Sequence, residues 1–147
     1  MATIDNMFEL AIDLRNNGAS EDSIRVLSTI LDNYPTYERL DAVYSMLGGV
    51  YGDLGQQIKA LDNFKKATAL NPKSEIASLG LYVTYATLDR DEEAISELFR
   101  FLKQFPAKHY KITLKELFEG LANGYMTKYK SDIIKLAKQN GIGLSDN

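Results

Sequence analysis

Few side chains in this sequence have the type and spacing that catalysis or metal binding requires. The 147 residues include no cysteine and one histidine, His109. Disulfides, thiolate zinc sites and a cysteine nucleophile are therefore excluded, and a two-histidine metal site lacks its second ligand. His109 lies just after Pro106, between two helical patterns, where a surface position is expected. A catalytic base would also need a nucleophile and an orienting group, so we predict no enzymatic activity, no cofactor and no metal ion.

Two short stretches look like functional motifs, but each has a simpler explanation. The acidic triplet 91–93 lies at the expected start of a helix, where negative charge is favourable beside the helix dipole. The glycine-rich stretch 48–55, GGVYGDLG, lies within a helical pattern and lacks the Lys-Ser/Thr ending of a phosphate-binding loop. Lysines between 128 and 138 form the only basic cluster in a chain of net charge −3. We therefore expect no nucleic-acid partner.

The N-terminal stretch 1–18 carries Asp5, Glu9 and Asp13 instead of the basic start and continuous apolar run of a signal peptide. No window of the sequence is long and apolar enough to span a bilayer. The lack of cysteine fits a reducing compartment. These features predict a cytoplasmic protein with no membrane partner.

The elements that must position these residues follow from the spacing of the three prolines. Pro35, Pro72 and Pro106 are separated by 37 and 34 residues, and a spacing in this range indicates a repeat. Each unit of the repeat contains two stretches with apolar residues at i, i+3, i+4 and i+7, the pattern of amphipathic helices. None shows the period-two alternation of a strand, so an all-α chain is predicted. The repeating segments are 4–37, 41–74 and 75–108.

Local signals predict where some of these helices begin. Ser74 is the expected N-cap of the helix that follows it. Asp89 and Glu92, three residues apart before an apolar run, resemble a capping box. Residues 38–40 separate the first two segments and amount to nearly one helical turn. They are expected to lengthen the first helix of the second segment.

Residues 109–141 depart from the repeat but still predict two helices. Asn123-Gly124 separates the two apolar stripes, and Gly141 is expected to end the last helix. The tail 142–147 is predicted to be disordered.

Segment 41–74 has the residue types of the tetratricopeptide repeat (TPR) at every signature position, namely Tyr44, Leu47, Gly48, Tyr51, Gly55, Ala60, Phe64, Ala67 and Pro72. Segment 75–108 matches less well because Tyr82 stands where a small residue is expected, and segment 4–37 has Ser23 and Leu27 in place of Ala and Phe. The chain therefore resembles the TPR family. That resemblance implies a single domain, 1–147, folded as a right-handed superhelical solenoid of antiparallel helix pairs, with 109–141 as a capping pair.

In the TPR family the first helix of each repeat lines a concave groove that binds a protein partner. The resemblance implies an acidic, polar wall from the first repeat, a middle nearly free of side chains and an apolar wall from the third. The corresponding positions are Phe8, Ile12, Arg15, Asn16, Ala42, Ser45, Gly49, Gly52, Asp53, Ile76, Leu79, Val83 and Ala86.

Glycines inside the helical pattern of the second repeat need an explanation, because each costs about 1 kcal/mol relative to alanine. Gly48 matches the small residue that lets paired helices approach closely. Gly49 and Gly52 are interpreted as the place where a partner backbone or helix lies close to the groove. Two alternatives stay open: the C-terminal helices fill the groove, or these glycines have no role.

One TPR subclass binds the acidic C-termini of chaperones with a clamp of Lys, Asn and Arg side chains. The corresponding positions here contain no cation, so we exclude that partner class. They are Asp5, Glu9, Ala42, Met46, Ile76 and Gly80.

The resemblance predicts a non-enzymatic protein-binding module that masks or holds a helix or extended segment of one partner. One version is an immunity protein that neutralises a cognate bacterial toxin, and the alternative is a secretion or assembly chaperone. Exposed Ile76, Leu79 and Val83 would form an apolar patch, which usually marks an interface. A self-associating scaffold, such as a homodimer through this third-repeat face, is a further alternative.

Overall fold

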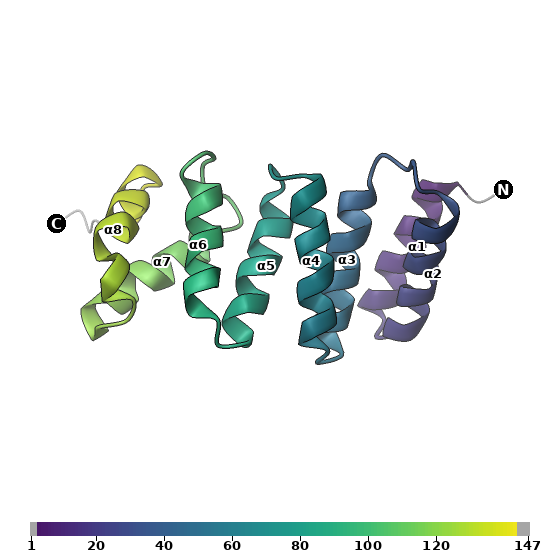
Figure 1. Ribbon diagram of the computed structural model, residues 1–147, viewed down its shortest axis with the longest axis horizontal. Coiled ribbons are helices and arrows are strands. Elements are labelled where there is room, and N and C mark those ends of the chain that lie inside the picture. Colours follow the sequence, from purple (N-terminus) through teal and green to yellow (C-terminus); the bar gives the residue numbers. More distant parts are fainter. Residues whose placement is uncertain (1–2, 144–147) are drawn as a thin grey trace. The chain divides into compact units, whose positions relative to one another are not determined.

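The computed structural model describes residues 3–143, which form helices and turns with no strand among them (Figure 1). The prediction of an all-α chain is confirmed. The α-helices are α1 (Ile4–Asn16), α2 (Ser20–Asn33), α3 (Leu40–Asp53), α4 (Gln57–Leu70), α5 (Glu75–Thr87), α6 (Asp91–Leu102), α7 (Lys111–Gly120) and α8 (Lys130–Gln139). Two short 3-10 helices, η1 (Leu121–Asn123) and η2 (Thr127–Tyr129), lie between α7 and α8.

The chain divides into two compact units. Unit 1 ends at Leu98 and unit 2 begins at Phe99, within α6. In unit 1, α1 packs on α2, α3 on α4, and α3 also contacts α1 and α5. Figure 1 shows α1 to α5 as successive helices joined by short turns. The apolar stripes predicted from sequence meet here, and α1, α2 and α3 share one core of Phe8, Ala11, Leu27, Ile30, Val43, Leu47 and Val50.

The three turns that close the helix pairs have the same hydrogen bonds. Gly18, Gly55 and Asp89 each adopt a left-handed conformation, with φ of 79°, 74° and 59°. The next N–H in each turn donates to the carbonyl five residues back, which is the Schellman motif. These bonds are Ala19 to Leu14 at 2.8 Å, Gln56 to Tyr51 at 2.9 Å and Arg90 to Tyr85 at 2.9 Å. Each turn residue is the fifteenth of its segment, so the three segments share one structural register.

Asp89 has a left-handed backbone conformation, which costs free energy for any residue with a β-carbon. We expect Asp89→Gly to raise the free energy of unfolding by about 0.5–1 kcal/mol, because relief of the left-handed strain exceeds the added entropy of the unfolded chain. Gly55→Ala, at the equivalent turn, should instead lower it by about 1 kcal/mol. Urea denaturation of both variants measures the two values. Equal and opposite effects are not required, but a destabilised Asp89→Gly would contradict the interpretation.

The starts of α5 and α6 can be compared with the helix caps predicted from the sequence. Ser74 is the N-cap of α5, since its hydroxyl accepts a hydrogen bond from the Ala77 N–H at 3.2 Å. The capping box at Asp89 is wrong, because α6 begins at Asp91 and Asp89 forms the left-handed turn instead. Arg90 follows this turn and donates to both carboxylate oxygens of Glu93 at 2.6 and 2.7 Å, which lowers the pKa of the Glu93 carboxyl.

The expected lengthening of α3 by residues 38–40 is also largely wrong. Leu40 is the first residue of the helix, whereas residues 38 and 39 form a turn. The Arg39 side chain lies over the Phe8 ring, 4.8 Å from its centroid. Residues 38 and 39 therefore form a turn beside the core of α1, α2 and α3 and do not extend a helix.

Unit 2 is built around a buried tyrosine. Tyr110 is fully buried and its ring centroid lies 5.8 Å from that of Phe101. The Asn140 side chain accepts a hydrogen bond from the Ala107 N–H at 2.8 Å and donates one to the Leu136 carbonyl at the end of α8. Buried Leu114, Leu117, Ile133, Leu136 and Ala137 complete this core.

The turns predicted in unit 2 are present. Gly124 has φ of 82° after η1, and Gly141 has φ of 70° just beyond α8. Two residues of the predicted tail, 142 and 143, are described by the structure. The Ile142 N–H donates to the Ala137 carbonyl at 2.8 Å, and the backbone of Gly143 packs against the Phe118 ring. Residues 144–147 lie outside the described part of the chain.

Candidate functional site

The thirteen predicted groove residues all lie on α1, α3 and α5 of unit 1. Because α3 contacts both α1 and α5, the helices follow one another in the order α1, α3, α5. The shared turn register places equivalent positions at equal distances from the turn in each helix. Twelve of these residues, all except Phe8, are partly or largely exposed. We call these twelve the α1/α3/α5 face.

Phe8 is not part of that face, and its predicted role is wrong. The ring is 3% exposed and belongs to the core formed by α1, α2 and α3. Arg39, from the insertion at 38–40, also lies over the ring. A large apolar side chain at this position gains more by burial than by lining a surface.

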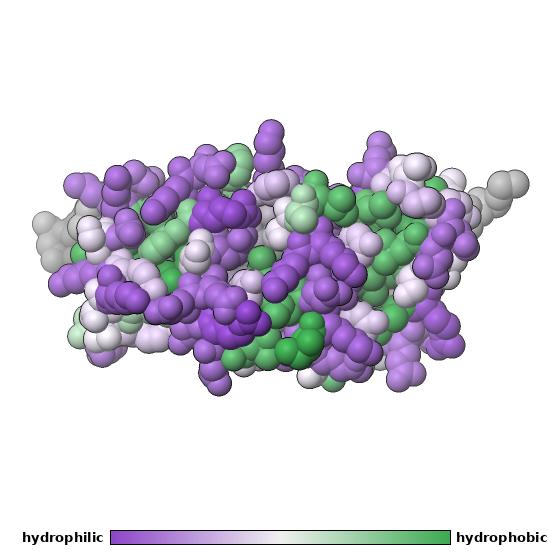
Figure 2. All heavy atoms as spheres, viewed as in Figure 1, coloured by the Kyte–Doolittle hydropathy of each residue, from purple (hydrophilic) through white to green (hydrophobic). Residues whose placement is uncertain are grey.

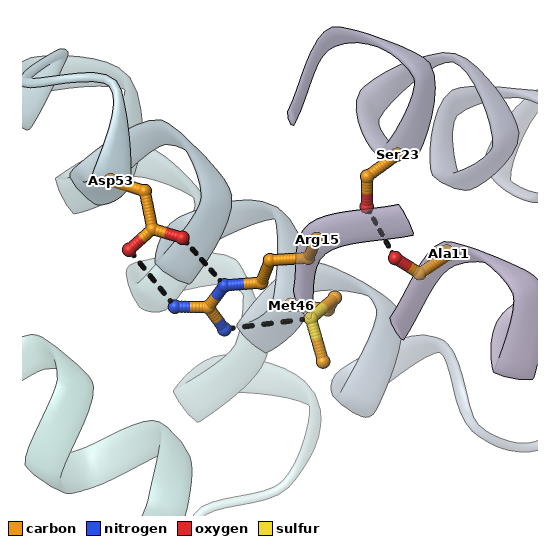
Figure 3. Close-up of polar contacts among 5 residues, drawn as sticks. All are labelled: Ala11, Arg15, Ser23, Met46 and Asp53. Atoms are coloured by element: carbon orange, nitrogen blue, oxygen red, sulfur yellow. Dashed lines mark hydrogen bonds and ion pairs between the residues drawn. The ribbon is translucent and has the colours of Figure 1, made fainter. Parts of the chain in front are cut away.

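The middle of the face is not free of side chains. The Arg15 guanidinium reaches from α1 to α3, where its Nε and Nη2 donate to the Asp53 carboxylate at 2.7 and 3.2 Å (Figure 3). Its Nη1 also lies 3.6 Å from the sulfur of Met46. A β-carbon on Gly49 would come within 2.6 Å of this guanidinium. Gly49 therefore makes room for the chain's own Arg15.

This arrangement predicts a measurable coupling between Arg15 and Asp53. The side chains are 31% and 46% exposed, so solvent screens the pair. We expect a double-mutant cycle with Arg15→Met and Asp53→Asn to give a coupling of about 0.5–1 kcal/mol. The coupling should shrink between 0.05 and 0.5 M salt. Gly49→Ala should raise stability less in the wild type, where the Arg15 guanidinium must move aside, than in the Arg15→Met background, and equal effects in both would contradict the contact.

Two other helical glycines are explained by one aromatic ring. The Phe64 ring of α4 lies so close to Gly48 of α3 and Gly80 of α5 that added β-carbons would stand 2.7 and 2.2 Å from it. The expected role of Gly48 in close packing is thus confirmed. Gly80 was not predicted as a packing residue, although a glycine inside a helical pattern is a signal of this kind. Gly52 differs from Gly48, Gly49 and Gly80, since no packing neighbour among residues 3–143 lies within 4 Å of the added carbon.

The degenerate first repeat is accommodated in the core. Ser23, which stands where an alanine is expected, is fully buried, and its hydroxyl donates to the Ala11 carbonyl at 2.7 Å (Figure 3). Leu27 is fully buried in place of the expected phenylalanine. Both departures from the repeat pattern therefore serve packing.

Apolar side chains on α5 reach the surface of the face. Ile76 and Val83 are 58% and 50% exposed, and Leu79 between them is half-buried. Their spacing of three and four residues puts them on one side of the helix, and we call them the α5 strip. Figure 2, which is drawn from the side where α2 and α4 lie in front of α1 and α3, shows that apolar side chains also reach the surface there. Isolated apolar residues on a surface are ordinary, but a strip along one helix is less so.

Carboxylates dominate the opposite side of the face. Asp5, Glu9 and Asp13 follow one another at four-residue spacing on α1 and are all exposed, so they share one side of the helix. We call them the α1 acid row. Asp5 accepts a hydrogen bond from the Tyr37 hydroxyl at 2.5 Å. Burial, and then this bond, raise the pKa of the Tyr37 phenol.

Unit 2 has a hollow of its own that sequence reasoning did not predict. It has a volume of about 450 Å³ and lies between α7, η1 and α8. Its walls are mainly apolar, and Glu119 and Lys130 bring opposite charges to it. Its size and lining suit an apolar side chain or a small apolar group. The lining residues are Phe118, Glu119, Leu121, Ala122, Lys130 and Ile134.

The sequence offered one histidine as a possible catalytic base. His109 is exposed in unit 2. Within residues 3–143 no three histidine, cysteine or acidic side chains gather where a metal ion could be held. The helices of that same range are all too short or too polar to cross a bilayer.

Comparison with known proteins does not identify the chain: no protein-family model matches it, and no curated protein resembles it in sequence. The resemblance to the TPR family therefore stays a prediction. What the chain does is inferred from its residues and their geometry.

Proposed function

We propose that the chain is a TPR-type helical repeat protein that binds one protein partner on the α1/α3/α5 face and catalyses no reaction. Three helix pairs in one register, each closed by the same Schellman turn, support a repeat architecture of the TPR kind. The right-handed superhelical solenoid and the capping role of 109–141 belong to this proposal.

The α5 strip is the observation that carries the proposal. Ile76 and Val83 are 58% and 50% exposed to water. Exposure of apolar surface to water costs free energy, and a partner that covers the strip would remove that cost. Gly52 adds support, because a helical glycine costs about 1 kcal/mol relative to alanine and, in the described part of the chain, no packing neighbour comes within 4 Å of a β-carbon added there. A partner segment that approaches α3 at Gly52 and covers the α5 strip accounts for both features.

A module with one binding face and no reactive site acts by masking or holding its partner. An immunity protein that neutralises a cognate bacterial toxin is the version we favour, and a secretion or assembly chaperone in the cytoplasm is the alternative. A self-associating scaffold is the second candidate, because the same α5 strip could be covered by a second copy of the chain.

Affinity capture followed by reconstitution tests the proposal. The bait proteins are the wild type, an Ile76→Asp/Val83→Asp variant and the control Ile58→Asp, whose side chain is 69% exposed on α4. We expect one protein to be retained by the wild type and the control but not by the double variant. With that protein purified, isothermal titration should show at least a 100-fold weaker affinity for the double variant and less than a threefold change for the control.

Two results would contradict the proposed binding of one protein partner on this face. A partner that all three baits retain equally binds elsewhere on the chain. A mass that doubles with concentration for the wild type and the control, but not for the double variant, identifies self-association. Circular dichroism of each bait confirms that the substitutions leave the helices intact.

A further inference from the structure

We infer that the segment bound on the α1/α3/α5 face is a cationic amphipathic one, with apolar side chains on the α5 strip and Lys or Arg side chains toward the α1 acid row. This inference rests on the proposed function and adds the chemistry of the partner. It is carried by the distribution of apolar surface and charge across three adjacent helices.

The apolar half of the partner follows from α5. Glu75, at its N-terminus, is the only charged residue in the whole helix. The side of α5 that carries Ile76, Leu79 and Val83 therefore has no charged side chain over about two turns, so a partner cannot form an ion pair with it there. A segment that covers it must present apolar side chains at matching spacing.

The cationic half follows from the balance of charge. Helices α1, α3 and α5 together contain six carboxylates, on Asp5, Glu9, Asp13, Asp41, Asp53 and Glu75. Their only cation is Arg15, and its guanidinium is committed to Asp53. The twelve residues of the face contain one cation and one carboxylate, so the excess negative charge of these helices lies mainly on the α1 acid row, and it favours Lys and Arg on a segment that extends over that row.

The α1 acid row has a local cost that the fold does not offset. Like charges at i, i+4 destabilise a helix by about 0.2–0.5 kcal/mol per pair. Asp5 gains from the helix N-terminus and from the Tyr37 hydroxyl. Glu9 and Asp13 lie further along the helix and are exposed. Cations supplied by a partner would turn this repulsion into attraction.

The dimensions of the face agree with a helical segment. Packed helices are about 8–10 Å apart, so α1 and α5 are separated by about 16–20 Å across α3. A helix with its side chains is about 10–12 Å wide, and Lys or Arg can reach several ångströms beyond that. On α3 itself the face has small side chains at Ala42, Ser45 and Gly52, while Gly49 lies under Arg15 and Asp53 pairs with it.

Model peptides test the inference with the full-length chain. The probe is an 18-residue labelled helix of Leu and Lys, with Leu at i, i+3, i+4 and i+7, and its comparison replaces every Lys by Glu. Fluorescence anisotropy should give an affinity at least tenfold higher for the Lys peptide. Ile76→Ser/Val83→Ser should weaken its binding at least tenfold, and Glu9→Gln/Asp13→Asn about threefold to tenfold at 0.05 M salt.

Matched variants control for general attraction between a basic peptide and an acidic protein. Ile58→Ser removes an exposed apolar side chain from α4, and Glu21→Gln/Asp32→Asn removes two exposed carboxylates from α2. Both should change the affinity by less than twofold. The effect of Glu9→Gln/Asp13→Asn should fade at 0.5 M salt, whereas the effect of Ile76→Ser/Val83→Ser should persist.

The outcomes separate this inference from the proposed function. If the Glu peptide binds as tightly as the Lys peptide and still depends on the α5 strip, the cationic partner is wrong while the binding face stands. The same holds if capture yields a partner that needs the strip but the peptides do not bind. If neither peptide nor captured protein depends on the strip, both the inference and the proposed function are overturned. A peptide affinity that falls equally in the α2 control contradicts the assignment to α1.

Discussion

Phe8→Ala is expected to lower the free energy of unfolding by about 3–5 kcal/mol. The ring is 3% exposed and packs in the core that α1, α2 and α3 share. Its removal would leave a cavity there and would also end the contact with the Arg39 guanidinium, 4.8 Å from the ring centroid. Urea denaturation followed by circular dichroism measures the change.

Two further variants separate the contributions to this loss. Phe8→Leu keeps most of the apolar volume and should cost clearly less than Phe8→Ala. Arg39→Met removes only the cation and should cost about 0.5–1 kcal/mol, as expected for a cation–π contact at the surface. A change below about 1 kcal/mol for Phe8→Ala would contradict the burial of Phe8. It would indicate a surface position, as the repeat pattern alone predicts.

Gly80→Ala is expected to lower the free energy of unfolding by about 1–3 kcal/mol, the usual cost of an overfilled core. The added β-carbon would stand 2.2 Å from Cε1 of Phe64, and the Phe64 ring is itself buried. The same ring is held on its other side by Gly48, where an added carbon would be 2.7 Å away. The ring therefore has little room to move, and α4 and α5 must separate instead.

A double-mutant cycle shows whether Phe64 is the cause. Phe64→Leu removes the ring atoms nearest to Gly80, so Gly80→Ala should cost less in that background, with a coupling of about 0.5–3 kcal/mol. The matched control is Gly52→Ala, since its added carbon has no packing neighbour within 4 Å among the residues that the structure describes. That variant should raise stability by about 0.5–1 kcal/mol. If Gly80→Ala costs the same with Leu at position 64, the ring is not the obstacle.

The local parts of this fold could be predicted because they depend on residues close together in the chain. The apolar spacing of each helix, the Ser74 N-cap and the left-handed glycines that end helices act over five residues or fewer. The exceptions are equally local. Asp89 looks like a helix cap in the sequence. In the structure it is the left-handed turn residue of the third segment, at the position that Gly18 and Gly55 occupy in the first two.

The candidate face could be predicted only as a set of positions. Sequence reasoning placed Arg15, Gly49 and Asp53 on it but not their contact, which joins residues 38 positions apart. It could not foresee that Phe64 would face both Gly48 and Gly80, nor that Phe8 would turn into the core. The hollow in unit 2 was missed because it arises between helices whose own stripes are ordinary.

By itself, the sequence determined that the chain is all helical and where most helices end. It also determined that the predicted binding positions carry glycines in the second repeat and apolar side chains in the third, and that the first repeat has a row of carboxylates. These properties depend on residue type and on spacing within one or two turns. Only the tertiary structure decided which glycine faces a ring, which faces a guanidinium and which faces open space. The reason is physical: a glycine's neighbours across a helix interface are set by how separate helices pack, and that packing depends on the shapes of all the side chains between them.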